Sequence, residues 1–164
     1  MSAEVEAIER ATVAAVSPDA LGDIEGWLLP FDHGTVSRAR SAVPLRHAPA
    51  AEGTLERIEQ GYAAQGLPPM LRLADLACFD GLRAELEARR YRGAKPTLVQ
   101  TTTLRRMQAV APAGALPAEV DTAPDEAWAA LFLGEGFDPV DGAHRVRVLA
   151  RAQGSLYASV REGG

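Results

Sequence analysis

A short run of apolar residues constrains the fold more than any other feature of this chain. Trp27, Leu28 and Leu29 are consecutive and lead into Pro30 and Phe31. Because side chains alternate between the two faces of a strand, such a run places apolar groups on both faces. A strand of this kind lies inside a sheet that is covered on each side. The sequence therefore predicts a layered α/β fold, with Trp27 and Leu29 on one face and Leu28 on the other.

Helices are expected to supply the layers around this strand. Apolar residues spaced three and four apart predict an amphipathic helix over residues 5–16, which should lie against the sheet. The same spacing predicts a second helix over residues 55–66 and a third that begins after Asp75, a residue type that suits an N-cap. The apolar face of the third helix is formed by Phe79, Leu82 and Leu86.

Several further segments have the composition of strands. We expect residues 26–31 and 35–43 to form a hairpin that turns at His33-Gly34, residues 70–73 and 156–160 to form short strands, and residues 97–104 to form an inner strand rich in β-branched side chains. Residues 144–152 fit a strand or a helix. The order of elements predicts an α/β fold with a mixed central sheet and flanking helices.

A change of composition divides the chain. Residues 108–124 are rich in Ala, Pro and Gly and show little periodicity, as linkers do. Asp125 and Glu126 then open a predicted helix, where acidic residues match the helix dipole. We therefore predict an N-terminal half over residues 1–107, a linker over 108–124, and the opening elements of a second, incomplete half over 125–164.

Charge and reactive side chains exclude several classes of function. The net charge of −5 without a basic cluster disfavours binding to nucleic acid or to an anionic membrane. Cys78 is the single cysteine, so an intramolecular disulfide is excluded and a buried core thiol is expected. The histidines, His33, His47 and His144, lack the short spacing of metal sites, so no metal site is predicted. An acidic start without an apolar signal segment predicts a cytoplasmic protein.

Three arginines are candidates for binding a substrate. Arg38 and Arg40 are two residues apart on a predicted strand, so both side chains would leave the same face and could hold a carboxylate or phosphate between them. Arg72 lies between Leu71 and Leu73 on the next predicted strand. The alternative for all three arginines is a solvated face of the sheet.

The residues around the first hairpin resemble a known family. Gly26-Trp27-Leu28-Leu29, followed by Arg-Ala-Arg-Ser-Ala-Val-Pro-Leu over residues 38–45, resembles the N-terminal half of two-part GNAT-type N-acetyltransferases. Later pieces match the same pattern in order: Tyr62 with Gly66-Leu67-Pro68, then residues 71–73, 82–91 and 96–104. Trp128 and residues 156–160 look like the start of the second, acetyl-CoA-binding half.

The resemblance implies a GNAT-like (acyl-CoA N-acyltransferase-like) fold and transfer of an acetyl group from acetyl-CoA to a small-molecule or peptide amine. Tyr62 and Tyr157 are candidates for a phenol that protonates the departing thiolate, with core packing as the alternative. Arg161 and Gly164 match the first two fixed positions of the family's pyrophosphate-binding loop, Arg/Gln-x-x-Gly-x-Gly/Ala. A hairpin turn explains the residues after Arg161 equally well.

Because the rest of that loop does not follow, we expect the isolated chain to bind acetyl-CoA negligibly and to be inactive by itself. A competing hypothesis is a non-catalytic binding or assembly module, whose open sheet edge is covered by a second copy or by a missing C-terminal half. A truncated remnant without function is the third alternative.

Overall fold

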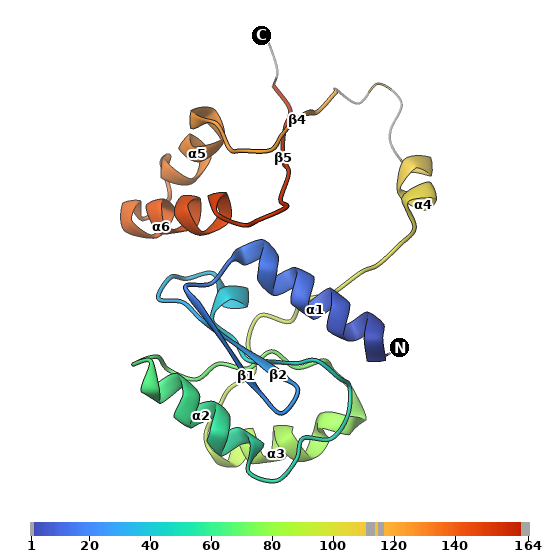
Figure 1. Ribbon diagram of the computed structural model, residues 1–164, viewed down its shortest axis with the longest axis vertical. Coiled ribbons are helices and arrows are strands. Elements are labelled where there is room, and N and C mark those ends of the chain that lie inside the picture. The colour runs from blue at the N-terminus through green and yellow to red at the C-terminus, as the bar shows by residue number, and fades with distance from the viewer. Residues whose placement is uncertain (1, 111–113, 115–116, 162–164) are drawn as a thin grey trace.

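The computed structural model describes residues 2–110, 114 and 117–161, which form a mixed α/β structure (Figure 1). Its helices and strands, in chain order, are α1 (Ser2–Val16), β1 (Ala20–Ile24), β2 (Trp27–Phe31), β3 (Val43–Pro44), α2 (Thr54–Ala64), α3 (Asp80–Ala88), α4 (Leu104–Ala109), β4 (Glu119–Asp121), α5 (Glu126–Leu133), α6 (Pro139–Ala150) and β5 (Tyr157–Ser159). Two short 3₁₀ helices cover Ser37–Ala39 and Ala77–Phe79. In the described residues the expected mixed central sheet is replaced by two antiparallel sheets, β1-β2-β3 and β4-β5.

The predicted strand over residues 26–31 is confirmed as β2, but its hairpin partner precedes it. β1 pairs antiparallel with β2 along its whole length. Glu25 and Gly26 form the two-residue turn, with φ angles of 46° and 83°. Positive φ at both central positions gives a turn whose twist matches that of the flanking strands. The prediction of a hairpin that turns at His33-Gly34 is therefore wrong.

Most of the predicted returning strand over residues 35–43 is coiled. It contains the 3₁₀ helix Ser37–Ala39, and within residues 35–43 only Val43, in β3, pairs with β2. The guanidinium of Arg40 donates to the carbonyl of Gly34 at 3.1 Å, which closes the segment back on itself. Arg38 and Arg40 therefore do not extend from one face of a strand, and the alternation of charge that predicted the strand belongs to a compact loop.

The faces of β2 are buried as predicted. Trp27 and Leu29 belong to a large apolar cluster that includes α2 and α3, whereas Leu28 packs with Val13 of α1 and Val43 of β3. Each of the residues Trp27, Leu28 and Leu29 is at most 5% exposed. The sheet therefore separates α1 from α2 and α3, and each side has its own apolar core.

Tyr62 lies in the larger core. It is fully buried on α2, its ring packs edge-on against Phe31, and its hydroxyl donates to the carbonyl of Pro30 at 3.0 Å. Burial raises the pKa of this phenol far above its usual value. In this structure the Tyr62 hydroxyl provides the hydrogen bond that the Pro30 carbonyl of β2 needs, and it does not face solvent.

The prediction of an inner strand over residues 97–104 is wrong. Leu98 and Val99 are 87% and 69% exposed, and within the described residues no strand pairs with this segment. Leu104 instead begins α4, where the Thr103 side chain accepts a hydrogen bond from the Arg106 amide. β-branched side chains favour strands mainly through packing against neighbouring strands, so without such neighbours the composition does not produce one.

Residues 70–73 contribute a bridge and not the predicted strand. Ala42 and Leu71 form an isolated parallel bridge, with amide-to-carbonyl hydrogen bonds of 2.8 Å on either side. Asp75 is not the N-cap of α3, which begins five residues later after a 3₁₀ turn; its carboxylate lies 3.7 Å from the Arg83 guanidinium. Arg83 of α3 also donates to the carbonyls of Ala74 and Leu76, which ties this segment to the helix.

Aspartate side chains cap the N-termini of the two C-terminal helices, α5 and α6. Asp125 accepts the Trp128 amide at 2.7 Å to start α5, as predicted, and Asp138 accepts two amides of the first turn of α6. The ambiguous residues 144–152 are helical up to Ala150.

β5 confirms the strand predicted near residues 156–160, and it pairs with β4, which lies inside the predicted linker. The proposed division into two halves stays a prediction.

None of the helices in the described ranges is both long enough and apolar enough to cross a membrane.

We expect Tyr62→Phe to destabilise the chain by about 1–3 kcal/mol, because the buried Pro30 carbonyl loses its donor. Tyr91→Phe is the matched control, since the Tyr91 hydroxyl donates to Glu59 in a half-exposed position. Urea unfolding of both variants measures the difference. Equal stability of the two variants would show that the Tyr62 hydroxyl contributes no more than a surface hydroxyl.

Candidate functional site

The C-terminal helix α6 packs against the N-terminal layers at the point where α1 ends (Figure 1). Val148 of α6 is fully buried, and the guanidinium of Arg151 donates twice to the carbonyl of Ser17, at 3.0 and 2.6 Å. Segments from the two ends of the chain therefore meet at a junction. The fully buried carboxylate of Asp32 lies at this junction.

Asp32 is at the centre of this junction. It directly follows β2, so the buried strand carries its side chain into the interior, where it is fully buried. One carboxylate oxygen, Oδ1, accepts the Gly34 amide at 2.8 Å. The other, Oδ2, has no hydrogen-bond partner among the described residues. A buried carboxylate oxygen without a donor is costly, so this site favours a cationic or protonated group beside it.

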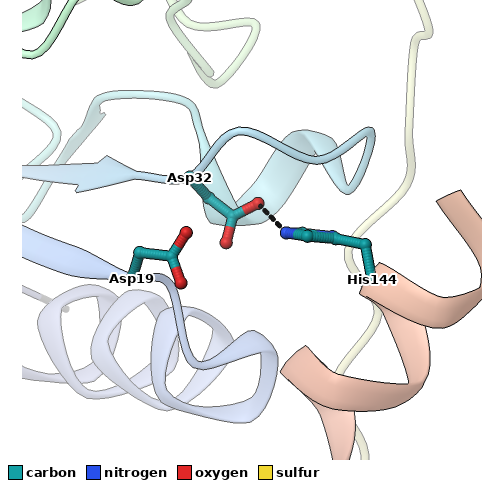
Figure 2. A group of neighbouring side chains, drawn as sticks. All are labelled: Asp19, Asp32 and His144. Atoms are coloured by element: carbon teal, nitrogen blue, oxygen red, sulfur yellow. Dashed lines mark ion pairs between the residues drawn. The ribbon is translucent and has the colours of Figure 1, made fainter. Parts of the chain in front are cut away.

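His144 of α6 reaches Asp32 from the other side (Figure 2). Its side chain is 12% exposed, and Nε2 lies 3.1 Å from Asp32 Oδ1. Neither ring nitrogen has a hydrogen-bond partner in the part of the chain that the structure describes. The ring lies directly over the Gly34 backbone, where an added Cβ would be 2.0 Å from the ring atoms Cε1 and Nδ1. Only glycine leaves room for the ring at this position.

Asp19 and Arg151 complete the junction. Asp19 immediately precedes β1, and its Oδ1 lies 2.9 Å from Arg151 Nη2. The same nitrogen is 3.9 Å from Asp32 Oδ2, which is within range of an ion pair but too far for a hydrogen bond. Donor atoms of Asp19, Asp32 and His144 all lie within 4.8 Å of one another.

A groove of about 510 Å³ opens beside this junction. Its volume is in the range of small-molecule sites. One wall comes from α1 and the segment after it, and the other comes from the chain that follows α6. The lining residues include Arg10, Val13, Asp19, Leu28 and Arg151. Asp19 and Arg151 therefore belong both to the groove and to the polar junction.

A second polar contact fixes α6 to the loop after β2. Thr35 donates to the Asp141 carboxylate at 2.5 Å, and Arg145 donates to both Thr35 and Asp141, at 2.6 and 2.7 Å. Hydrogen bonds from Thr35 and then Arg145 hold the pKa of Asp141 below its usual value. This exposed network lies one helical turn from His144 and orients the face of α6 that meets Asp32.

The arginines predicted to bind substrate do not gather at this junction. Arg38 is exposed on the 3₁₀ helix, and Arg40 is tied to the Gly34 carbonyl. Arg72 pairs with Glu9 of α1 at 2.5 Å. Their roles in binding a substrate stay predictions, but two of the three guanidinium groups already have partners within the chain.

The remaining predicted residues lie near the second sheet or elsewhere. The Tyr157 hydroxyl donates to the Leu149 carbonyl at 2.7 Å in a half-buried position. Arg161 pairs with Asp125 and with Glu119, the latter at 3.3 Å. Gly164 lies outside the described residues. Cys78 is half-buried against the larger core.

Sequence reasoning missed the junction because its members are far apart in the chain. Asp19, Asp32 and His144 follow no short spacing that metal or catalytic motifs use, so no local signal joins them. The prediction that the scattered histidines make no metal site considered histidine pairs alone. It did not consider that a buried aspartate at a strand end would meet a histidine from a distant helix.

A comparison with protein families gives a match over almost the entire chain. The model described as "Probable histone acetyltransferase Rv0428c C-terminal" matches residues 2–161. The chain belongs to this family. The curated protein "Probable histone acetyltransferase Rv0428c" of Mycobacterium tuberculosis (strain ATCC 25618 / H37Rv) is 38% identical over 74 residues, which are 45% of this chain and 24% of that protein. The match thus spans about a quarter of the relative's length. No solved structure matches the chain.

Family membership supports the resemblance to acetyltransferases at a coarse level. The family is described by the C-terminal part of its namesake, whereas the sequence resemblance was to the N-terminal half of a two-part GNAT protein. The GNAT fold and that position within it stay predictions.

We expect Gly34→Ala to destabilise the chain by about 1–3 kcal/mol, because the new Cβ must displace the His144 ring or the whole of α6. Gly81→Ala is the matched control, since no atom of the described residues lies within 4 Å of the corresponding Cβ in α3. Urea unfolding compares the two. A Gly34→Ala variant as stable as the parent chain would contradict the packing of His144 over this glycine.

The Thr35, Asp141 and Arg145 network predicts a dependence of stability on pH. The pKa of Asp141 is lowered from its ordinary 3.8, so its contribution is fully present above pH 3.8 and is lost as the pH falls through the lowered value. We expect Asp141→Asn to lower the thermal unfolding midpoint at pH 7 and to have a smaller effect near pH 2, because the Asp141 carboxylate is increasingly protonated as the pH falls. Asp23→Asn, on the exposed edge strand β1, is the control. An equal effect of Asp141→Asn at both pH values would rule out the charged network as its cause.

Proposed function

We propose that this chain is part of an N-acetyltransferase that transfers the acetyl group of acetyl-CoA to an amine. The observation that carries the proposal is the family match over residues 2–161, because it covers both the N-terminal layers and the C-terminal helices. The printed name of the relative specifies histone, a protein with many lysine amines. A lysine side chain in a basic peptide is therefore the acceptor that we propose first, ahead of a small-molecule amine.

The charge of the chain supports a cationic acceptor. The net charge of −5 attracts a basic peptide through long-range electrostatics. The groove beside α1 has the volume for one extended side chain, and the Asp19 carboxylate lies on its wall. Arg10 and Arg151 also line the groove, and Asp19 is paired with Arg151, so a cationic side chain would compete with Arg151 for the Asp19 carboxylate. This groove is the place in the described residues where we expect the acceptor to bind.

The residues proposed for acetyl-CoA do not fit that ligand in the described chain. An anion such as pyrophosphate requires free N–H donors and positive charge. Arg161 is already paired with Asp125 and Glu119, and those bonds keep its pKa raised. No step of the reaction is therefore assigned to Arg161. Binding of acetyl-CoA would depend on residues beyond the described ones or on breaking this network.

An assembly module remains the second candidate, and exposed apolar side chains favour it. Leu98, Val110 and Val140 are 87%, 79% and 80% exposed, and others lie on α4, α5 and β4 and beside β5. Extended apolar exposure marks surfaces that another chain covers. In this candidate function, the segment around α4 would bind a second copy and the chain would perform no chemistry.

Acetyl transfer tests the first candidate. The protein should be purified from its native cell and incubated with radiolabelled acetyl-CoA and a lysine-rich peptide, with the same peptide carrying acetylated lysines as the control. We expect label on the free-lysine peptide alone. The 164-residue chain by itself should transfer no label and bind acetyl-CoA negligibly in calorimetry. A native protein that labels neither the peptide nor a panel of small amines would contradict the proposal.

Light scattering separates the two candidates. The assembly function predicts that the chain is a dimer and that Leu98→Ser with Val110→Ser returns it to a monomer. A monomeric parent chain would exclude that candidate, whereas the acetyltransferase proposal would be unaffected.

A further inference from the structure

We infer that Asp19, Asp32 and His144 form a binding site for a divalent transition-metal ion of the zinc type, which fastens α6 to the ends of β1 and β2. The inference does not rest on the acetyltransferase proposal, because it concerns metal binding at the junction, but it shares Asp19 with the groove proposed for the acceptor. The three side chains come from three separate segments, and their donor atoms lie within 4.8 Å of one another (Figure 2).

The contact between His144 and Asp32 has the spacing of two ligands of one ion. Zinc binds histidine nitrogen and carboxylate oxygen at about 2.0–2.2 Å, so two such atoms in a tetrahedral shell lie about 3.3 Å apart. Nε2 and Oδ1 are 3.1 Å apart. An ordinary hydrogen bond would also bring them this close, but His144 Nε2 makes none with the described residues.

The unpartnered oxygen of Asp32 is the second observation that points to a ligand. Asp32 is fully buried, and its Oδ2 accepts no hydrogen bond within the described parts of the chain. The carboxylates of Asp19 and Asp32 lie close together (Figure 2), and the Arg151 guanidinium is bonded to Asp19 but not to Asp32. The Gly34 amide holds Asp32 Oδ1 in place, as the hydrogen bonds behind metal-binding carboxylates do.

Arg151 supplies part of the positive charge but does not fill the site. Its Nη2 is bonded to Asp19 and is 3.9 Å from Asp32, beyond hydrogen-bonding distance. Two of its hydrogen bonds go to the Ser17 carbonyl, so its position does not depend on the carboxylates. The two carboxylates of Asp19 and Asp32 face a single guanidinium, that of Arg151, and a divalent ion would add positive charge beside them.

The groove gives an ion access to this site. Asp19 is exposed and lines the groove, whereas Asp32 lies behind it. Three protein ligands leave a fourth tetrahedral position, and a water from the groove would occupy it. Because its ligands join the start of β1, the end of β2 and α6, the bound ion would stabilise the folded chain.

Calorimetry with Zn²⁺ as the probe tests the site in the complete 164-residue chain after treatment with a chelator. We expect one ion per chain, a micromolar or tighter dissociation constant, and a thermal unfolding midpoint that rises with zinc. Co²⁺ in place of Zn²⁺ should give the visible absorption of a tetrahedral site. The absence of one-to-one zinc binding would overturn the inference and leave a plain His144 to Asp32 ion pair.

Matched variants locate the site. His144→Gln and Asp32→Asn should weaken zinc binding at least about tenfold and remove the cobalt absorption. His47→Gln changes an exposed histidine far from the junction and should have no effect. Binding that survives His144→Gln but not His47→Gln would overturn the assignment.

Two further variants keep the test decisive where a buried substitution prevents folding. Asp19→Asn changes an exposed ligand and should weaken zinc binding without loss of the cooperative melting transition seen by circular dichroism. Arg151→Gln removes the competing positive charge and should strengthen zinc binding several-fold. Unchanged affinity in the Asp19→Asn variant would contradict the inference.

Discussion

The burial of β2 on both faces is the constraint on which the rest of this structure depends. Leu28 and Leu29 point to opposite sides of the sheet, and each is at most 2% exposed. Fully burying side chains of this size contributes about 1.5–3 kcal/mol each, so the chain must supply a layer on either side. α1 forms one layer, and α2 with α3 forms the other. The turn at Gly26 then places β1 at the edge and directs the end of β2 toward the interior.

The polar junction follows from that geometry. A strand buried on both faces delivers the next residue, Asp32, into a dry environment, and a carboxylate there requires compensation. The compensating groups come from the other end of the chain: His144 of α6 and, at longer range, Arg151. α6 is therefore held to the N-terminal layers by a requirement for charge balance as well as by the burial of Val148. The groove beside the junction is lined by α1, β1, β2 and the chain after α6.

The sequence predicted the features that depend on local periodicity. The helices over residues 5–16 and 55–66, the two faces of β2 and the Asp125 cap all arise within one or two turns of chain, and the structure confirms them. The partner of β2 was missed because Leu21, Gly22 and Asp23 are weak strand formers whose pairing is imposed by the Glu25-Gly26 turn. The opposite error occurred for residues 97–104, where a strand was predicted and none formed. The strand propensity of these residues has no effect without a neighbouring strand. Among the described residues, none of those put forward from the sequence for catalysis or binding belongs to the junction. The Asp32 and His144 contact was not, because tertiary packing alone brings it together.

The contact between Asp32 and His144 leads us to expect that α6 and the N-terminal layers unfold as one cooperative unit. Amide hydrogen exchange measured by NMR tests this, because it reports the free energy of opening residue by residue. We expect the amides of Val148 and Leu149 to exchange through the same opening, with the same free energy and denaturant dependence, as those of Leu28 and Leu29. Exchange of the α6 amides through a separate, low-energy opening while β2 stays protected would contradict it.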